Sequence, residues 1–425
     1  MSEVIKLKHV ARIRPSNVDK KTADGELSVR LCNYTDVYYN EVIRGELEFM
    51  PASATPDQVR QFELRAGDVL ITKDSETADD IAIPAFIVED LAGVLCGYHL
   101  SLVRPHRDRI DPKFLFWCMS STMVRSQAEN YAAGITRVGI RSDLVGSLLV
   151  PYLPVERQRA IAIHLDAETS RIDALIAKKR RLVRLLEESF SSWVFAEVTG
   201  REAGEKQPSN LAWVDWIPSA WRSVPLRYFA RLGTGHTPSR THPEYWVDCN
   251  VPWISLFDVG AMRDPFAEMT STTKQRISDL GLANSSAVLL PAGTVVLSRT
   301  ASVGFATIMG NAMAVSQHFV TWTCGEDLLP EYLLYVLRAM RQEWESLQVG
   351  TTNVTVFMPD LYAVRIPLPP LMKQEQIVAR IQRRRESVRQ LLSALESQVS
   401  LLVEHRQAII TAAVTGEIDT PWAAA

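Results

Sequence analysis

The chain has 425 residues, of which 47% are hydrophobic and 22% are charged. This is the composition of a folded globular protein, and the length predicts two or three domains, so a disordered or fibrous chain is excluded. The formal net charge of -3 excludes a histone-like polycation, so any contact with nucleic acid must use a local basic surface.

The five cysteines are scattered and form no C-x-x-C pair. This pattern is typical of reduced thiols in the cytoplasm rather than of a disulfide framework. The first ten residues contain no apolar signal core, and no segment has the ~18 consecutive apolar residues that a membrane span needs. We therefore expect a cytoplasmic protein without a membrane segment.

Residues 1–154 predict a first module of mixed α and β structure. Alternating apolar residues at 67–72 and 82–88 indicate strands, and the pattern at 112–131 indicates an amphipathic helix. The segment 33–40 combines polar and aromatic residues and favours an exposed loop. An aromatic turn packed on the module's own core is an equally good interpretation.

Residues 155–200 predict a long helix. Pro154 stands where a helix start tolerates proline, Gly200 stands where a helix end favours glycine, and neither residue type occurs between them. Apolar residues recur at spacings of three and four, as in a heptad seam. In this register the seam comprises Ile161, Leu165, Ile172, Leu175, Leu182, Leu186 and Trp193.

The second half of the chain follows the same plan. A polar linker at 201–210 leads into a second module that ends at residue 369, with a strand pattern at 294–299 and a helical pattern at 330–348. A second long helix is predicted over 370–416, followed by a tail at 417–425. Its seam comprises Ile377, Ile381, Val388, Leu391, Leu395, Leu402 and Ile409.

The ends of the two halves align without any insertion. Pro151–Pro154 matches Pro367–Pro370, and Val198–Gly200 matches Val414–Gly416. Each seam needs a partner, so we expect the two helices to pack antiparallel within the chain, related by a pseudo-two-fold axis with a module at each end. Two unrelated surface helices are the alternative. The predicted fold class is mixed α/β, with two pseudo-repeated globular domains separated by two long antiparallel coiled-coil helices.

The sequence contains no catalytic motif of the common kinds. It lacks a Walker phosphate loop, a G-x-S-x-G elbow and an H-E-x-x-H pair, and Gly233–Gly235 lacks the rest of a dinucleotide fingerprint. His99 and His318 occupy matching places in the modules, where packed or surface histidines are more frequent than metal ligands. We therefore predict no catalytic residue and no metal site.

Three features make the chain resemble the specificity subunits of type I restriction-modification systems. One is the duplicated plan of a module followed by a helix, and another is the signature at Pro367–Ile377. The third is the start of the second module, Trp216–Trp221, followed by Leu232–Ser239 and Pro252–Ile254. The resemblance spans nearly the whole chain, although Lys373 replaces the glutamate that usually precedes the first glutamine of the signature.

The resemblance implies a DNA-recognition subunit with no chemistry of its own. Each module would be a target recognition domain that reads one half of a bipartite DNA site, and the helices would dock two methyltransferase subunits. Those partner subunits would hold S-adenosylmethionine and flip the target base, and a restriction subunit using ATP and Mg would join for cleavage. The alternatives are the specificity subunit of a type II-like complex, a scaffold that binds only protein, and an enzyme with an unrecognised site.

Residue types that contact bases and phosphates mark candidate DNA-binding positions. The strand-end cations Lys73 and Arg299 and the turns that begin at Gly134 and Gly350 recur at matching places, although a solvated role is equally compatible with each cation. The candidates are Tyr34, Tyr38, Tyr39, Lys73, Thr136, Arg137 and Arg141 in the first module, and Thr237, Ser239, Arg240, Lys274, Arg299, Thr300, Thr352 and Asn353 in the second. The candidates for helix packing and partner docking are Leu165, Ile172, Leu175, Leu182, Leu186, Ile381, Val388, Leu391, Leu395 and Leu402.

Overall fold

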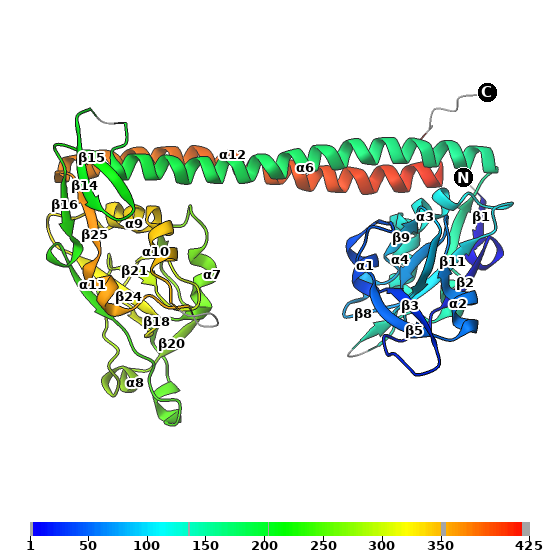
Figure 1. Ribbon diagram of the computed structural model, residues 1–425, viewed down its shortest axis with the longest axis horizontal. Helices are drawn as coiled ribbons and strands as arrows, with labels where there is room; N and C mark the ends of the chain where they lie inside the picture. Colours follow the sequence, from blue (N-terminus) through cyan, green and yellow to red (C-terminus); the bar gives the residue numbers. More distant parts are fainter. Residues whose placement is uncertain (1–2, 135–136, 203, 350–353, 419–425) are drawn as a thin grey trace. The chain divides into compact units, whose positions relative to one another are not determined.

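The protein is described by a computed structural model (Figure 1). It describes residues 3–134, 137–202, 204–349 and 354–418. The chain divides into two compact units, of which unit 1 comprises residues 1–179 and 397–425 and unit 2 comprises residues 180–396. Each unit contains strands and helices in one module together with segments of two long helices, so the predicted mixed α/β class is confirmed. Among the residues described, no helix has the length and apolarity required to cross a membrane.

The first module is built on two sheets. The five-stranded sheet has the order β2 (Ala11–Pro15), β11 (Leu100–Pro105), β7 (Val69–Thr72), β9 (Pro84–Ile87) and β4 (Val42–Ile43). The four-stranded sheet has the order β5 (Met50–Ala54), β3 (Leu27–Cys32), β10 (Leu91–Cys96) and β6 (Glu63–Leu64). The strands predicted at 67–72 and 82–88 are confirmed as β7 and β9.

The helix predicted over 112–131 is two helices, α3 (Pro112–Ser120) and α4 (Thr122–Tyr131). The break falls at Ser121, which has extended backbone geometry and whose hydroxyl accepts a hydrogen bond from the Val124 amide, as an N-cap does. The other elements of this module are β1 (Glu3–Lys6), η1 (Leu7–His9), α1 (Tyr34–Tyr39), α2 (Pro56–Phe62), β8 (Asp74–Ser75), η2 (Ala78–Asp80), β12 (Val138–Gly139), α5 (Ser142–Val145) and β13 (Leu149–Tyr152).

The second module repeats the five-stranded sheet. Its order is β17 (Ala230–Thr234), β24 (Phe319–Cys324), β21 (Val295–Ser298), β22 (Ala306–Met309) and β19 (Met269–Thr270). In both sheets the first four strands pair antiparallel and the last strand joins the edge in parallel. A shared topology of this kind agrees with the internal repeat seen in the sequence.

The rest of the second module departs from the sequence-based expectation in two places. The helix predicted over 330–348 breaks at Met340, and the segment 201–210, expected to be a linker, ends in the first strand of a hairpin. That strand reads as polar because only Ser209 and Leu211 are buried within it. The elements are β14 (Lys206–Leu211), β15 (Val214–Pro218), β16 (Arg222–Pro225), η3 (Leu226–Tyr228), η4 (Pro243–Trp246), β18 (Val251–Ile254), η5 (Leu256–Asp258), α7 (Val259–Met262), β20 (Gln275–Ile277), α8 (Asp279–Ala283), β23 (Ala314–Val315), α9 (Pro330–Ala339), α10 (Arg341–Ser346), α11 (Met358–Ala363) and β25 (Arg365–Leu368).

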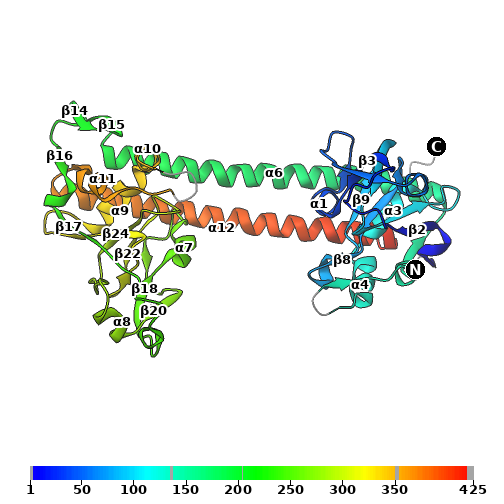
Figure 2. The same cartoon turned by 60° about the horizontal axis from the view of Figure 1, so that its bottom comes forward.

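The two long helices are α6 (Val155–Thr199) and α12 (Leu371–Thr415), and both contribute to each unit. In unit 1, Asp173 of α6 pairs with Arg406 of α12, and Lys179 bonds to Gln398. In unit 2, Glu197 pairs with Arg380 at 2.6 Å, and the Arg384 guanidinium lies 5.0 Å from the centre of the Trp193 ring. Residue numbers rise on one helix as they fall on the other, so the predicted antiparallel pairing is confirmed within each unit (Figure 2).

The register of the predicted seam is wrong at three of its fourteen residues. Leu175, Leu182 and Leu391 are exposed by 46%, 43% and 46%, whereas Leu395 is buried as predicted. Ile172 belongs both to the predicted seam and to the packed face of the helix. From Ile172, a spacing of three residues leads to Leu175 and a spacing of four leads to Ile176. The sequence-based register chose Leu175 and Leu182, but the helix buries Ile176. The helices instead bury Ile176 and Phe190 of α6 and Leu392 of α12, and Val183 of α6 packs partly buried against the core of unit 2.

The remaining predicted seam residues differ in how deeply they pack. Ile161, Leu165, Ile172, Ile377 and Ile381 are buried. A further group is only partly buried, namely Leu186, Trp193, Val388, Leu402 and Ile409.

Adjacent leucines on α12 offer a direct test of the corrected register. Leu392 is 7% exposed and packs in the core of unit 2, whereas Leu391 is half exposed. We expect Leu392→Ala to lower the free energy of unfolding by ~2–5 kcal/mol and Leu391→Ala to lower it by less than ~1 kcal/mol, because only the first leaves a cavity. Denaturant unfolding of the two variants measures the difference. Equal losses would contradict the corrected register.

A buried glutamine explains the most specific part of the repeated signature. Gln158 is fully buried, and its amide donates to the carbonyls of Leu153 and Arg109 at 2.7 and 3.2 Å. Its side-chain oxygen accepts from the amide of Asp111, the N-cap residue of α3, at 2.7 Å. The glutamine therefore joins the first turn of α6 to the start of a helix in the module.

The second copy makes the same three contacts. Gln374 is fully buried, donates to the carbonyls of Pro369 and Asp327 at 3.0 and 2.9 Å, and accepts from the Leu329 amide at 3.0 Å. Leu329 is the N-cap residue of α9. Both signatures thus attach a long helix to the module that precedes it.

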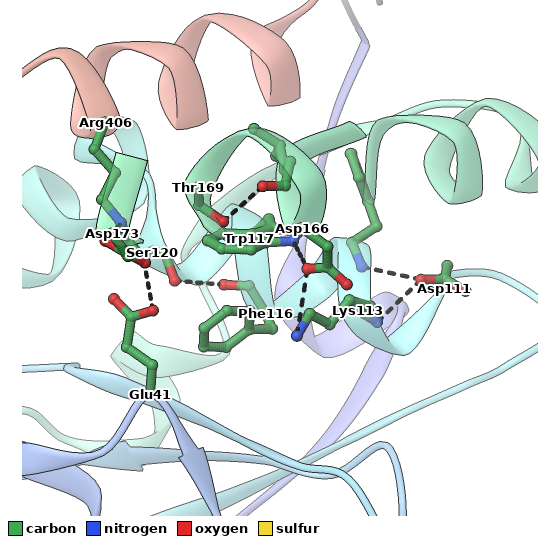
Figure 3. Close-up of polar contacts among 12 residues, drawn as sticks. Glu41, Asp111, Lys113, Phe116, Trp117, Ser120, Asp166, Thr169, Asp173 and Arg406 are labelled. Carbon is green, nitrogen blue, oxygen red and sulfur yellow. Dashed lines mark hydrogen bonds and ion pairs between the residues drawn. The ribbon is translucent and has the colours of Figure 1, made fainter. Parts of the chain in front are cut away.

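Polar contacts also hold the first module to the helices (Figure 3). Arg406 of α12 contacts Glu41 of the module at 2.6 Å and Asp173 of α6 at 2.9 Å. On α6, Asp166 accepts a hydrogen bond from the Trp117 indole at 3.0 Å and lies 3.4 Å from Lys113. Arg406 is only 14% exposed, so these contacts are shielded from solvent more than ordinary surface ion pairs.

Candidate nucleic-acid interface

The candidate site of the first module lies where two parallel strands end. β3 and β10 pair in parallel, with Cys32 opposite Cys96. After β10 the chain makes a tight turn, in which the Leu100 amide bonds to the Gly97 carbonyl at 3.0 Å. After β3 it enters α1, and the Gly97 amide bonds to the Cys32 carbonyl at 2.9 Å. The carboxyl ends of parallel strands are where open α/β sheets bind ligands.

The second module has the same arrangement. β18 and β23 pair in parallel, with Ile254 opposite Val315. The turn after β23 is closed by a hydrogen bond from the Phe319 amide to the Ser316 carbonyl at 3.2 Å, and the Ser316 amide bonds to the Ile254 carbonyl at 2.9 Å. We call each turn, together with the helix start beside it, a turn site. The turn sites centre on Tyr98 and His99 in the first module and on Gln317 and His318 in the second.

The helix starts beside the two turns are capped in the same way. Asn33 and Ser255 are the N-cap residues, and their amides bond to the carboxylates of Asp36 and Asp258 at 2.7 and 2.8 Å. Such reciprocal capping fixes the direction in which the chain enters the helix. The two turn sites therefore share one backbone framework.

The turn site of the first module borders a cavity of about 260 Å³. Asn33, Tyr34 and Thr35 line it from the helix start, and Tyr98 and His99 line it from the turn. Its other lining residues are Val18, Asp19, Lys20 and Met50. Amide, hydroxyl, imidazole and ammonium groups around one hollow can accept from and donate to the edge of a base.

The strand-end cations Lys73 and Arg299 lie next to the turn sites at matching places. The Lys73 amide bonds to the His99 carbonyl at 3.1 Å, and the Arg299 amide bonds to the His318 carbonyl at 2.9 Å. Their charged groups, however, contact protein atoms. The Lys73 ammonium donates to the Ser16 carbonyl at 2.9 Å and lies 4.2 Å from the centre of the Tyr98 ring.

Arg299 is held by two carbonyls. Its Nε donates to the Gln317 carbonyl at 3.1 Å, and its Nη1 donates to the Val356 carbonyl at 3.3 Å. Burial lowers the pKa of Lys73 and of Arg299. Both charged groups are thus held by protein carbonyls, and Arg299 supports its turn through Gln317, while DNA contact by either cation stays a prediction.

A charged cluster lies beside the turn of the first module. Asp74 accepts from His99 and from Arg137, with 2.9 Å between the paired atoms in each case. Arg137 is a predicted contact residue and its side chain is 55% exposed, so part of its guanidinium faces solvent. In the second module, burial and then the charge of Arg299 lower the pKa of His318.

The segment 33–40 forms a short helix, α1, rather than the exposed loop that was expected. The capping box at Asn33 and Asp36 explains the helix, which polar composition alone did not reveal. Tyr34 bonds to Ser75 and Tyr38 bonds to Asp80, both at 3.1 Å, so their hydroxyls are engaged within the module. Tyr39 is 77% exposed.

The candidates near the start of the second module fall into two groups. Thr237 lies at the turn site, where its hydroxyl donates to the Gln317 side-chain oxygen at 2.6 Å. The amide of Lys274 bonds to Asp258 at 2.7 Å, which places Lys274 near the helix start of the same site. Ser239 bonds to Thr241, and Arg240 lies 4.8 Å from the centre of the Trp246 ring.

Other candidates are placed as follows. Thr300 forms an isolated bridge with Thr355, and Arg141 pairs with Asp143 at 2.9 Å while its side chain remains 80% exposed. Thr136, Thr352 and Asn353 lie outside the described residues. DNA contact by all fifteen candidates stays a prediction.

Sequence reasoning missed the residues at the centre of the turn sites. Tyr98 is 51% exposed, and Gln317 is exposed at the same place in the second module. Leu256 and Phe257 begin the helix of the second turn site with 37% and 69% of their surfaces exposed. The signal available in the sequence was position, because Tyr98 and Gln317 immediately precede the matching histidines.

Two further sequence features have structural explanations. Gly235 lies against the Val315 carbonyl, where a Cβ atom would come within 1.7 Å of the oxygen, so this glycine serves close packing.

Cys32, Cys96 and Cys118 are buried, and burial raises the pKa of each thiol. In the part of the chain that the structure describes, no group of three or more His, Cys, Asp or Glu side chains could hold a metal ion.

Comparison with known proteins identifies relatives of one kind. Residues 218–397 match the family profile of the type I restriction modification DNA specificity domain. The type I restriction enzyme MjaIX specificity subunit of Methanocaldococcus jannaschii is 25% identical over 163 residues, which cover 38% of this chain and 37% of that protein. The match thus spans little more than a third of that relative. The putative MjaX specificity subunit of the same organism is 22% identical, covering 85% of this chain and 81% of that protein.

Solved structures show the same fold. The HsdS subunit from Thermoanaerobacter tengcongensis is 21% identical with a TM-score of 0.53, and the alignment covers 98% of this chain and 97% of that one. A second similar chain comes from a structural study of complex assembly and conformational transition in the type I R-M system. It is 21% identical with a TM-score of 0.67, and the alignment covers 98% of both chains. Residues 218–397 therefore belong to the type I restriction modification DNA specificity domain family, and the chain as a whole shares the fold of the HsdS subunit and of the type I R-M chain.

Proposed function

We propose that the chain is the DNA sequence-recognition subunit of a type I restriction-modification complex, in which each module reads one half of a bipartite site. The observation that carries this proposal is the pair of turn sites. Their backbones are held by the same hydrogen bonds, whereas the residues at their centres are Tyr98 in one module and Gln317 in the other. A constant framework with different exposed side chains suits two readers of different sequences.

The partners follow from the same proposal. Two methyltransferase subunits dock on the helices and hold S-adenosylmethionine, and restriction subunits that use ATP and Mg join them for cleavage. Exposed leucines beside the packed seam offer apolar contacts for docking. They are Leu175, Leu182, Leu185, Leu391 and Leu401, with exposed fractions between 43% and 62%.

The decisive experiment compares host genomes with and without this gene by methylation sequencing. A bipartite, non-palindromic methylated motif that disappears with the gene supports the proposal. A methylated motif that persists unchanged contradicts it. A palindromic motif, or cleavage without a translocating partner, would favour a type II-like complex instead. If the purified chain carries bound partner proteins but shows no preference for any DNA sequence, a scaffold that binds only protein would be favoured.

We predict that the purified chain alone neither transfers methyl groups nor cleaves DNA. The reason is that the proposed chemistry and its cofactors belong to the partner subunits. The assay uses tritiated S-adenosylmethionine and duplex containing the host motif, with the chain alone and with the chain plus methyltransferase subunits. Methyl transfer by a preparation shown by mass spectrometry to lack partner subunits would overturn this assignment.

A further inference from the structure

Hydrogen bonds hold Gln317 both at its backbone and at its side chain. Its backbone carbonyl accepts a hydrogen bond from the Arg299 Nε at 3.1 Å, and its side-chain oxygen accepts one from the Thr237 hydroxyl at 2.6 Å. The turn that carries it is closed by the bond between Phe319 and Ser316. Gln317 is nevertheless exposed, so an ordered side chain faces solvent at the turn site. A side chain fixed in this way loses little conformational entropy when it binds.

The hydrogen bond from Thr237 decides what Gln317 can offer to a ligand. An amide side chain has one acceptor oxygen and two N–H donors. The Thr237 hydroxyl takes one of the two lone pairs of the oxygen, so the two N–H donors of the amide nitrogen are the larger free capacity at the turn site. A major-groove base edge with an acceptor satisfies such a donor: guanine offers N7 and O6, adenine N7, and thymine O4. Cytosine presents only its N4 amino donor there, so it leaves the N–H donors of Gln317 without an acceptor.

We infer that Gln317 is a specificity-determining residue of the second module, which donates from its amide to a base acceptor and rejects cytosine at one position of its half-site. The inference deepens the proposed function and rests on it. Thr237 and Arg299 are positioning residues, because they act through Gln317. In the first module, Tyr98 occupies the equivalent place and offers a ring face and a hydroxyl instead, so the two half-sites are distinguished at this position by different chemistry.

The substitution Gln317→Glu tests the inference while keeping the shape of the side chain. A carboxylate can keep the bond from Thr237 on one oxygen and accept from the cytosine N4 amino group with the other. The full chain is co-expressed with the methyltransferase subunits of its host, and the purified complex selects from a duplex library randomised over both half-sites. We expect one position of one half-site to change its preference toward cytosine by about fivefold to a hundredfold relative to the other bases.

Two further variants separate this role from general effects. Gln342→Glu adds the same charge to an exposed glutamine of α10 in the same unit, and it should leave every base preference unchanged. Thr237→Val frees the side-chain oxygen of Gln317, so preference should weaken at the same position that Gln317→Glu alters. Base preference, rather than total affinity, is the quantity compared, because any added negative charge weakens binding to DNA.

The outcomes distinguish failure of this inference from failure of the proposed function. If the wild-type complex selects no bipartite motif, the proposed function fails. If the wild-type complex selects such a motif, the inference is overturned by a Gln317→Glu variant that keeps every base preference, that changes both half-sites, or that turns one position toward a base other than cytosine. It is also overturned if Gln342→Glu produces the same change.

Discussion

Replacing residues 1–154 with the first module of another family member is expected to change one half of the methylated motif and to leave the other half intact. The turn site around Tyr98 and its lining residues lie entirely within this segment. The turn site around Gln317 lies in unit 2, which is formed by residues 180–396 and has its own core. Each mismatched base costs ~1–3 kcal/mol, so the original half-site should lose its preference over several positions.

The measurement is methylation sequencing of a strain that carries the exchanged chain. The incoming module must keep counterparts of Glu41 and Trp117, because these residues contact the helices of the recipient chain. The reciprocal exchange of residues 206–369 serves as the matched control and should change only the other half of the motif. If both halves change in either exchange, the modules are not independent readers.

Gln374→Leu is expected to destabilise unit 2 by about 3 kcal/mol or more. Leucine has a similar volume but cannot replace the three hydrogen bonds, so the Leu329 amide and the carbonyls of Asp327 and Pro369 would lose this partner at a fully buried side chain. An unsatisfied buried polar group costs ~1–3 kcal/mol. Denaturant unfolding of the full chain, followed by circular dichroism, should show an early transition that the parent chain lacks.

Gln376→Leu provides the control for this prediction. Gln376 lies two residues further along the same helix and is exposed, so its replacement should change stability by less than ~0.5 kcal/mol. Gln158→Leu should produce an equivalent loss in unit 1, since Gln158 makes the same contacts there. A Gln374→Leu chain that unfolds like the parent would show that the signature glutamine does not hold the helix to its module.

The sequence was most informative where the repeat could be compared with itself. Uninterrupted helical composition and aligned prolines and glycines placed both long helices to within a residue or two. The same comparison predicted that Lys73 and Arg299 would lie at equivalent places, and their matching hydrogen bonds to His99 and His318 confirm this. Repeated local patterns are readable because each copy constrains the interpretation of the other.

The packing register of the long helices and the side-chain contacts could not be predicted from the repeat. Leucine occurs at both 391 and 392, and periodicity alone cannot decide which one the core of unit 2 buries. The contacts that Lys73 and Arg299 make within the protein could not be predicted, because their acceptors, the Ser16 and Gln317 carbonyls, are distant in sequence and meet them only after the strands pair. The turn-site glutamine was overlooked for the same reason, since Thr237 reaches it from a different part of the module.

The division of the chain into one continuous and one interrupted unit has a consequence for its biosynthesis. Phe114 of the first module shares its core with Ile410 and Val414 of α12, which the ribosome adds some three hundred residues later. Unit 2 is complete once residue 396 has emerged. Domains usually mature in the order of their translation. Here that order is reversed: the second module can finish folding first, while the first waits with part of its apolar surface uncovered, open to chaperones, until the last turns of α12 arrive.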